Sequence, residues 1–155
     1  MTYLAYCSIE GNKQGKFHGE NTKGHEKHRW INVISFSYGV SQPHDVATGK
    51  ASGKRQHQPV QIVKEWGPAS PQLFSALINN ESLNVVFHFT KTDQDGKEQV
   101  YHTIQLSGAS IVGITSHSNP KHKGKRLENI SLSYDKLNST GHLSLAAIHS
   151  MTQTA

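Results

Sequence analysis

The stretch "LNVVFHFTKTDQDGKEQV", from Leu83 to Val100, decides the fold class of this chain. Its first half alternates apolar and polar side chains, as expected of a β-strand with one buried face. The apolar positions are Leu83, Val85, Phe87 and Phe89, and those facing the other way are Asn84, His88 and Thr90. The segment "TDQDGKE" contains the pair Asp95-Gly96, which tolerates the positive φ of a tight turn. The stretch therefore predicts an antiparallel hairpin.

The same two-residue period recurs along most of the chain and predicts further strands. Their expected apolar faces are Tyr3, Ala5, Cys7 and Ile9; Trp30, Ile34, Phe36, Tyr38 and Val40; Val100, Ile104 and Leu106; Ile130, Leu132 and Tyr134; and Leu143, Leu145 and Ala147. Another strand is expected around residues 58–66. Polar sequence predicts a long loop at 11–29, and "NSTG" at 138–141 predicts a turn. Gly108 and Gly113 predict bends or β-bulges.

One helix is predicted after these first strands. Ser70 is its expected N-cap, with Pro71 at the first helical position, where a missing N–H has no cost. Apolar side chains follow on one side at helical spacing: Leu73, Phe74, Leu77 and Ile78. Asn79 and Asn80 tolerate left-handed geometry and are expected to end the helix. With about seven or eight strands and no βαβ alternation, we expect a mainly β fold. It would be a small β-barrel, or a compact sandwich, closed at one end by the helix, in a single domain over residues 1–155.

The composition suits one domain with one core, because the 155 residues are 34% hydrophobic and 17% charged. A net charge of +5 permits nucleic acid, membrane headgroups or acidic proteins as partners and requires none of them. Cys7 is the only cysteine, so an internal disulfide is excluded, and its place in an alternating strand predicts a buried, inert thiol. The start "MTYLAYCSIEGNK" lacks the features of a signal peptide, and no stretch is long enough to span a bilayer. We therefore expect synthesis in the cytosol and no stable membrane insertion.

The sequence predicts no catalytic, metal or cofactor-binding residues. No Cys or carboxylate completes a ligand set at a recognised spacing around His25 and His28 or around His117 and His122, so we expect solvated loop histidines. No serine stands in a Gly-x-Ser-x-Gly elbow, and the acidic residues are few and scattered. An enzyme of unknown type is therefore the least favoured of three interpretations.

Three basic loops provide an alternative function. They are "HEKHRW" (25–30), "GKASGKR" (49–55) and "NPKHKGKR" (119–126). Small β-barrels bind single-stranded nucleic acid with cationic grooves and stacking aromatic side chains. Trp30 could supply such a ring, although its place at the head of an apolar face favours core packing. A single-stranded nucleic-acid-binding small β-barrel is therefore the second interpretation.

Four segments, in order along the chain, carry a resemblance to a known family. They are "WINVISFSYGVSQ" (30–42), "ATGKASGKRQHQPVQIVKEW" (47–66), "SPQLFSALINNESL" (70–83) and "ITSHSNPKHKGKRLENISLSYDKL" (114–137). Together they resemble the hemolysin-coregulated protein (Hcp) family, the tube-forming subunit of the bacterial type VI secretion system. The resemblance runs over nearly the whole chain and is specific as a set. The loop at 12–29, unusually rich in His and Lys here, is the departure from the family's pattern.

The resemblance implies a structural protein, which is the first interpretation. In this family a β-barrel protomer closes into a six-membered ring, and rings stack into a hollow tube that a contractile sheath drives out of the cell. The implied partners are further copies of the chain, sheath proteins, a spike (VgrG-like) protein and effector proteins that the ring carries or chaperones, without nucleic acid. The protein would be cytoplasmic before firing and then secreted, or delivered to a target cell, without a signal peptide.

A long polar insertion before "PVQIVKE" then has an interpretation, since it holds no site residues. A ring needs a heterologous interface, in which one patch meets a different patch on the neighbour. Small residues in the insertion permit backbone contact, and its cations can pair with acids on another copy. We therefore predict an assembly arm. Its residues are His44, Asp45, Val46, Ala47, Thr48, Gly49, Lys50, Ala51, Ser52, Gly53, Lys54 and Arg55.

Overall fold

The computed structural model describes residues 5–21, 29–118, 121, 124–142 and 148–154. Among them there is one α-helix, α1 (Ser70–Ile78). The strands are β1 (Ala5–Gly11), β2 (Gly15–Lys16), β3 (Ile31–Val33), β4 (Ser35–Ser37), β5 (Val40–Ser41), β6 (Gln56–His57), β7 (Val60–Glu65), β8 (Leu83–Thr92), β9 (Glu98–Ser118), β10 (Arg126–Ser133), β11 (Lys136–His142) and β12 (Ile148–Thr154). The prediction of a mainly β fold with one short helix and an extended loop is confirmed.

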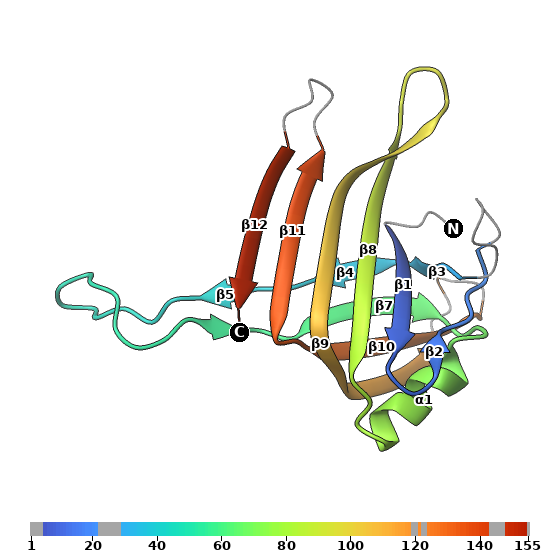
Figure 1. The fold of residues 1–155 in the computed structure, drawn as a ribbon, viewed down its shortest axis with the longest axis horizontal. Helices are drawn as coiled ribbons and strands as arrows, with labels where there is room; N and C mark the ends of the chain where they lie inside the picture. Colours follow the sequence, from blue (N-terminus) through green and yellow to red (C-terminus); the bar gives the residue numbers. More distant parts are fainter. Residues whose placement is uncertain (1–4, 22–28, 119–120, 122–123, 143–147, 155) are drawn as a thin grey trace.

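Ten strands form one strongly bent antiparallel sheet in the order β2-β1-β8-β9-β10-β7-β4, with β11 and then β12 added beside β9 and β3 beside β1, whereas β5 and β6 form a separate two-stranded sheet. β9 is 21 residues long and belongs to both halves, because it pairs with β8 and β11 along its first part and with β10 along its second. In Figure 1, β8, β9, β11 and β12 form one layer that crosses over β4, β7 and β10, and α1 lies at one end. The segment 31–37 links the two ends of this strand order, because β3 pairs with β1 near one end and β4 pairs with β7 at the other.

The hairpin predicted from 83–100 is confirmed. β8 and β9 pair in antiparallel register, and the turn between them is closed by hydrogen bonds between Asp93 and Lys97 and from the Gly96 N–H to the Asp93 carbonyl. Gly96 has a φ of 79°, which L side chains rarely adopt. The apolar face of β8 is buried at all four predicted positions. Local alternation and one Asp-Gly turn were therefore sufficient to predict this part of the sheet.

Both glycines predicted to bend β9 lie at irregularities. The register of β9 shifts opposite Leu83 and Val85, where Gly108 adopts a φ of 59°, and it shifts again between Gly113 and Ile111 against β10. An extra residue on one strand increases the local bend and twist. These bulges allow one long strand to pass from the first half of the sheet to the second.

One prediction about an apolar face was wrong. The long strand with Trp30 on its buried face is two short strands, and in β3 the buried residues are Ile31 and Val33. The chain changes partner from β1 to β7 at Ile34, and such a shift exchanges the two faces of a strand. Trp30 is instead partly buried against the His88 ring, at a centroid distance of 4.7 Å.

Two predictions about loops and turns were also wrong. "NSTG" at 138–141 lies inside β11, which pairs with β9 on one side and β12 on the other, so tertiary pairing overrides a turn-like composition. In the predicted loop at 11–29, Phe17 is fully buried and its N–H bonds the Ile9 carbonyl at 2.9 Å. The expected strand face at 143–147, like Tyr3, lies outside the described residues.

The helix begins and packs differently from the prediction. Ala69 is its N-cap, so Ser70 is the first helical residue and Pro71 follows it. Leu73 is buried and Leu77 packs against the core, but Phe74 and Ile78 are 57% and 67% exposed. Asn79 caps the helix and Asn80 has a φ of 50°, so the predicted C-terminal end is confirmed. α1 thus presents part of its apolar surface to solvent.

Cys7 is fully buried in β1, as predicted, and burial raises the pKa of its thiol from 9.0 despite the opposing influence of Lys64. At pH 8 we expect native protein to react with a thiol reagent at least about a hundredfold more slowly than unfolded protein, because the thiolate is the nucleophile. Since the raised pKa applies only to the folded state, the thiol should also reduce stability as the pH rises above 9.0. Stopped-flow labelling with and without urea checks the first expectation, and rapid labelling of native protein would contradict it.

Candidate assembly site

The predicted arm extends away from the sheet. It leaves through β5 and returns through β6, which pair with each other, and Figure 1 shows it as a long hairpin at one end of the molecule. An isolated bridge joins His44 to Ala51 within it. Every residue from 44 to 55 is exposed. The structure therefore places all the predicted arm residues together on one projection.

Backbone hydrogen bonds hold the arm in shape without a core. The Ser52 N–H bonds the Pro43 carbonyl at 2.8 Å, and the Asp45 N–H bonds the Lys50 carbonyl at 2.7 Å. At the tip, the Asp45 carboxylate accepts from the Ala47 N–H at 2.9 Å. Gly49 completes this turn with a φ of 70°, which suits glycine and strains other residues. The tip is thus a defined turn on a long stem.

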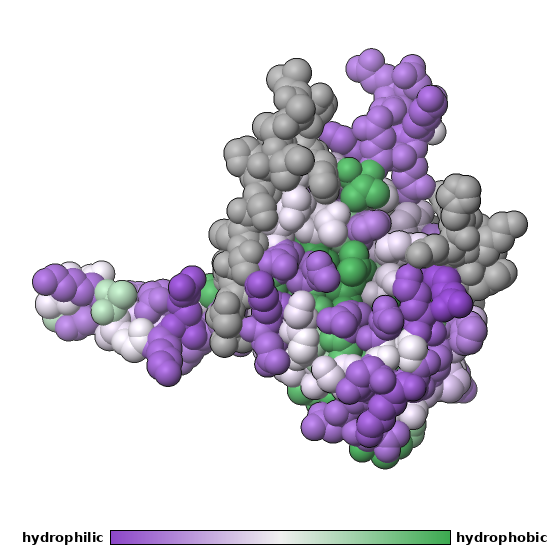
Figure 2. Space-filling model, viewed as in Figure 1, coloured by the Kyte–Doolittle hydropathy of each residue, from purple (hydrophilic) through white to green (hydrophobic). Residues whose placement is uncertain are grey.

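The arm's side chains have few partners in their own chain. Val46, at the tip, is 93% exposed. Within the part of the chain that the structure describes, Lys50, Lys54 and Arg55 form no ion pair. Figure 2 shows a mostly hydrophilic arm separated from the body of the molecule. Such a surface makes no contribution to a core and is available to another molecule.

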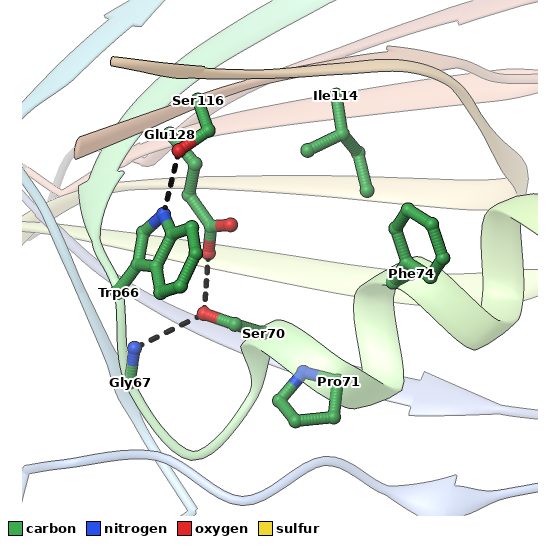
Figure 3. Close-up of a pocket in the computed structure, with 8 residues that line it drawn as sticks. All are labelled: Trp66, Gly67, Ser70, Pro71, Phe74, Ile114, Ser116 and Glu128. Carbon is green, nitrogen blue, oxygen red and sulfur yellow. Dashed lines mark hydrogen bonds between the residues drawn. The ribbon is translucent and has the colours of Figure 1, made fainter. Parts of the chain in front are cut away.

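An apolar groove lies at the other end of β7, beside α1. It has a volume of about 630 Å³, and Figure 3 shows its walls. The lining residues are Trp66, Gly67, Ser70, Pro71, Phe74, Ile114, Ser116 and Glu128. The Trp66 indole N–H donates to the Ser116 hydroxyl at 3.0 Å, and the Arg126 guanidinium lies 5.0 Å from the indole ring. These two contacts hold the ring as one wall, and Phe74 forms the opposite one.

A buried ion pair supports the floor of this groove. The Lys64 ammonium contacts Glu128 Oε1 at 2.6 Å, with both side chains almost fully buried. Ser70 donates to the same oxygen at 2.7 Å and accepts from the Gly67 N–H at 3.0 Å. The ammonium also donates to the Glu65 carbonyl at 2.7 Å. This network fixes the first turn of α1 against β7 and β10.

The groove and the ion pair were not predicted from the sequence. In the sequence, Lys64 is an ordinary strand lysine and Glu128 is one of several scattered acids. Their ion pair cannot be recognised there, because the two residues are 64 positions apart. Trp66 and Phe74 read as core residues on adjacent elements. The available signal was the closeness in sequence of Trp66, Pro71 and Phe74 around the helix start. The spacing of apolar residues alone does not show whether such side chains are buried or exposed to solvent.

The structure describes only part of the other predicted clusters. His25, His28 and His122 lie outside the described residues, and among those inside them no group of His, Cys, Asp or Glu is placed to hold a metal ion. Of the basic loops, the structure describes residues 29–30 of the first, all of the second, and residues 121 and 124–126 of the third. The second loop and Arg126 of the third lie at opposite ends of β7, which spans about 20 Å at roughly 3.3 Å per residue. In the described helix, no segment is long and apolar enough to cross a bilayer.

Comparison with known proteins identifies the family. The family model described as "Type VI secretion system effector, Hcp" matches residues 3–140. The "Major exported protein" of Pseudomonas aeruginosa is 33% identical over 160 aligned residues, which cover 93% of this chain and 92% of that protein.

Two solved structures extend the match to three dimensions. One, described as the crystal structure of Hcp protein, has a TM-score of 0.87 at 25% identity and covers 97% of this chain and 98% of its own. The secreted protein Hcp3 from Pseudomonas aeruginosa has a TM-score of 0.74 at 28% identity, and the match covers 95% of this chain and 97% of that protein's chain. The resemblance drawn from the four sequence segments is thereby confirmed, and the chain belongs to the Hcp family of the type VI secretion system.

Proposed function

We propose that this chain is a structural subunit that closes into six-membered rings and stacks into the inner tube of a type VI secretion system. The whole chain would act as one domain, without catalysis. The observation that carries the proposal is the arm at 44–55, which is ordered by its own hydrogen bonds and fully exposed. An ordered projection that adds nothing to its own core is available to another copy, and in a heterologous interface a patch on one copy meets a different patch on the next.

We further propose that the protein is made in the cytoplasm and exported without a signal peptide. Its relatives are described as exported or secreted proteins, which supports this location. The tube would contact sheath proteins and a spike (VgrG-like) protein, and its rings would carry or chaperone effector proteins. Tube subunits suit such a carrier role because a closed ring encloses a protected space.

Deleting residues 47–53 should leave a folded protein and abolish both ring closure and tube stacking. The deleted residues are exposed and comprise half of the arm tip and most of the returning stem, so their loss removes an intermolecular contact without opening the core. Circular dichroism and thermal unfolding check the fold, and negative-stain images with sedimentation analysis check rings and tubes. A control variant, Lys97→Ala, alters the exposed β8–β9 turn only.

The proposal is wrong if the deleted protein still forms tubes and is secreted as well as the parent chain. A lone subunit at every concentration of the parent chain would also contradict it. Salt-dependent binding to oligonucleotides would instead favour the single-stranded nucleic-acid interpretation.

A further inference from the structure

We infer that the groove beside α1 receives the arm tip of a second copy of this chain, with Val46 inserted between Trp66 and Phe74. This inference rests on the proposed assembly function and names the surface that its arm contacts. The occupant is the tip at 45–48, and each contact runs from the arm of one copy to the groove of the next.

The groove is an exposed apolar site that the protomer does not fill. Trp66 is 49% exposed, and Phe74 and Ile78 lie one helical turn apart on the open side of α1. Figure 2 shows hydrophobic atoms at the end of the molecule where α1 lies. Contiguous apolar surface between polar rims marks contact sites in soluble proteins. Aromatic walls of this kind also supply most of the binding energy at many interfaces.

One carboxylate oxygen at the groove accepts no hydrogen bond from the described residues. Glu128 is only 4% exposed, and its Oε1 accepts from both Lys64 and Ser70. No hydrogen bond reaches Oε2 from the described residues. Figure 3 shows this second oxygen directed toward the space between Trp66 and Phe74. An occupant that donates an N–H to this oxygen would form a charge-assisted hydrogen bond, which is stronger than a neutral one.

The arm tip has the complementary chemistry. Val46 is the most exposed large apolar side chain in the described part of the molecule. The backbone N–H groups of Val46 and Thr48 make no hydrogen bond within the described residues, so either can donate to an acceptor on another copy.

Charges at the two surfaces match as well. Arg126 lies beside the groove, with its guanidinium over the Trp66 ring, while the neighbouring Lys125 pairs with Glu65 at 3.6 Å. Asp45 is the only acid in the arm and directly precedes Val46. The arm's cations come later, toward its root, and would remain outside the groove. Opposite charges at the rim favour this orientation over the reverse one.

The positions of the two surfaces suit a repeating contact. β7 runs from the root of the arm to Trp66, so the arm and the groove lie at opposite ends of the same strand (Figure 1). A projection at one end and its receptor at the other cannot meet within one protomer. They meet between copies in a head-to-tail arrangement, which closes into a ring when the rotation allows.

Disulfide trapping tests the contact directly. In a Val46→Cys and Phe74→Cys double variant, oxidation should give a ladder of covalent multimers on non-reducing gels, because buried Cys7 is not available. The matched control combines Val46→Cys with Gln94→Cys, an exposed position in the β8–β9 turn, and should give no ladder. Equal cross-linking in both variants, or none in the first, would overturn the inference.

Charge substitutions provide a second test that separates this inference from the proposed function. Val46→Asp and Phe74→Asp should each raise the protein concentration needed for half-maximal ring assembly at least about tenfold, with unchanged circular dichroism. A mixture of the two variants should give heterodimers, since it restores one of the two contacts. Normal rings from both variants would overturn the inference and leave the proposed function standing. Absence of rings from the parent chain would overturn the proposed function itself.

Discussion

Replacing Lys64 by methionine should lower the free energy of unfolding by about 3–5 kcal/mol, because it leaves the Glu128 carboxylate buried without its counter-charge. Both side chains are almost fully buried and the contact is 2.6 Å, so solvent screens the pair very little. The substitution also removes the hydrogen bond to the Glu65 carbonyl. Urea unfolding followed by tryptophan fluorescence measures the change.

The matched control is the double variant Lys64→Met with Glu128→Leu. It replaces the pair by apolar side chains of similar size, and such replacements are often neutral in stability. We therefore expect the double variant to recover most of the lost free energy of unfolding. The remaining deficit comes from the Ser70 hydroxyl, which loses Glu128 as its acceptor. A single Lys64→Met variant within about 1 kcal/mol of the parent would contradict the expected cost of an unpaired buried charge.

Replacing Phe87 by alanine should lower the free energy of unfolding by about 3–5 kcal/mol, because it opens a cavity in the core. Phe87 is fully buried, and its ring packs against Phe36 at a centroid distance of 4.8 Å. Phe74→Ala is the matched control, since it makes the same chemical change at a largely exposed side chain. It should cost less than about 1 kcal/mol.

The two phenylalanines should behave in opposite ways in assembly. Phe87→Ala weakens the fold and should leave rings intact wherever the protein stays folded, whereas Phe74→Ala should keep the fold and weaken the rings. Thermal unfolding and sedimentation on the same samples separate the two effects. Equal loss of stability in both variants would mean that Phe74 packs into the core and that the groove is not an open site.

The sequence predicted the features that depend on neighbouring residues. Alternation over 83–89 and the Asp95-Gly96 pair were enough for the β8–β9 hairpin, because one buried face imposes a period of two. Gly108 and Gly113 marked the bulges in β9 for a similarly local reason. The arm was recognised from its run of small and charged residues, which do not pack into a core. Local composition and spacing are sufficient to recognise these elements.

What the sequence by itself determined is therefore a mainly β fold, one short helix and a polar arm. Only the tertiary structure decided which apolar residues face solvent, how β3 and β4 divide their partners, and that Lys64 meets Glu128. The physical reason is that a repeat of apolar residues shows only that one face of a helix or strand is apolar. Whether that face is buried, and which residues cover it, depends on contacts between segments that are distant in the sequence. Phe74 illustrates the difference, because its helical spacing is that of a core residue and its position at the open end of the sheet makes it a surface one.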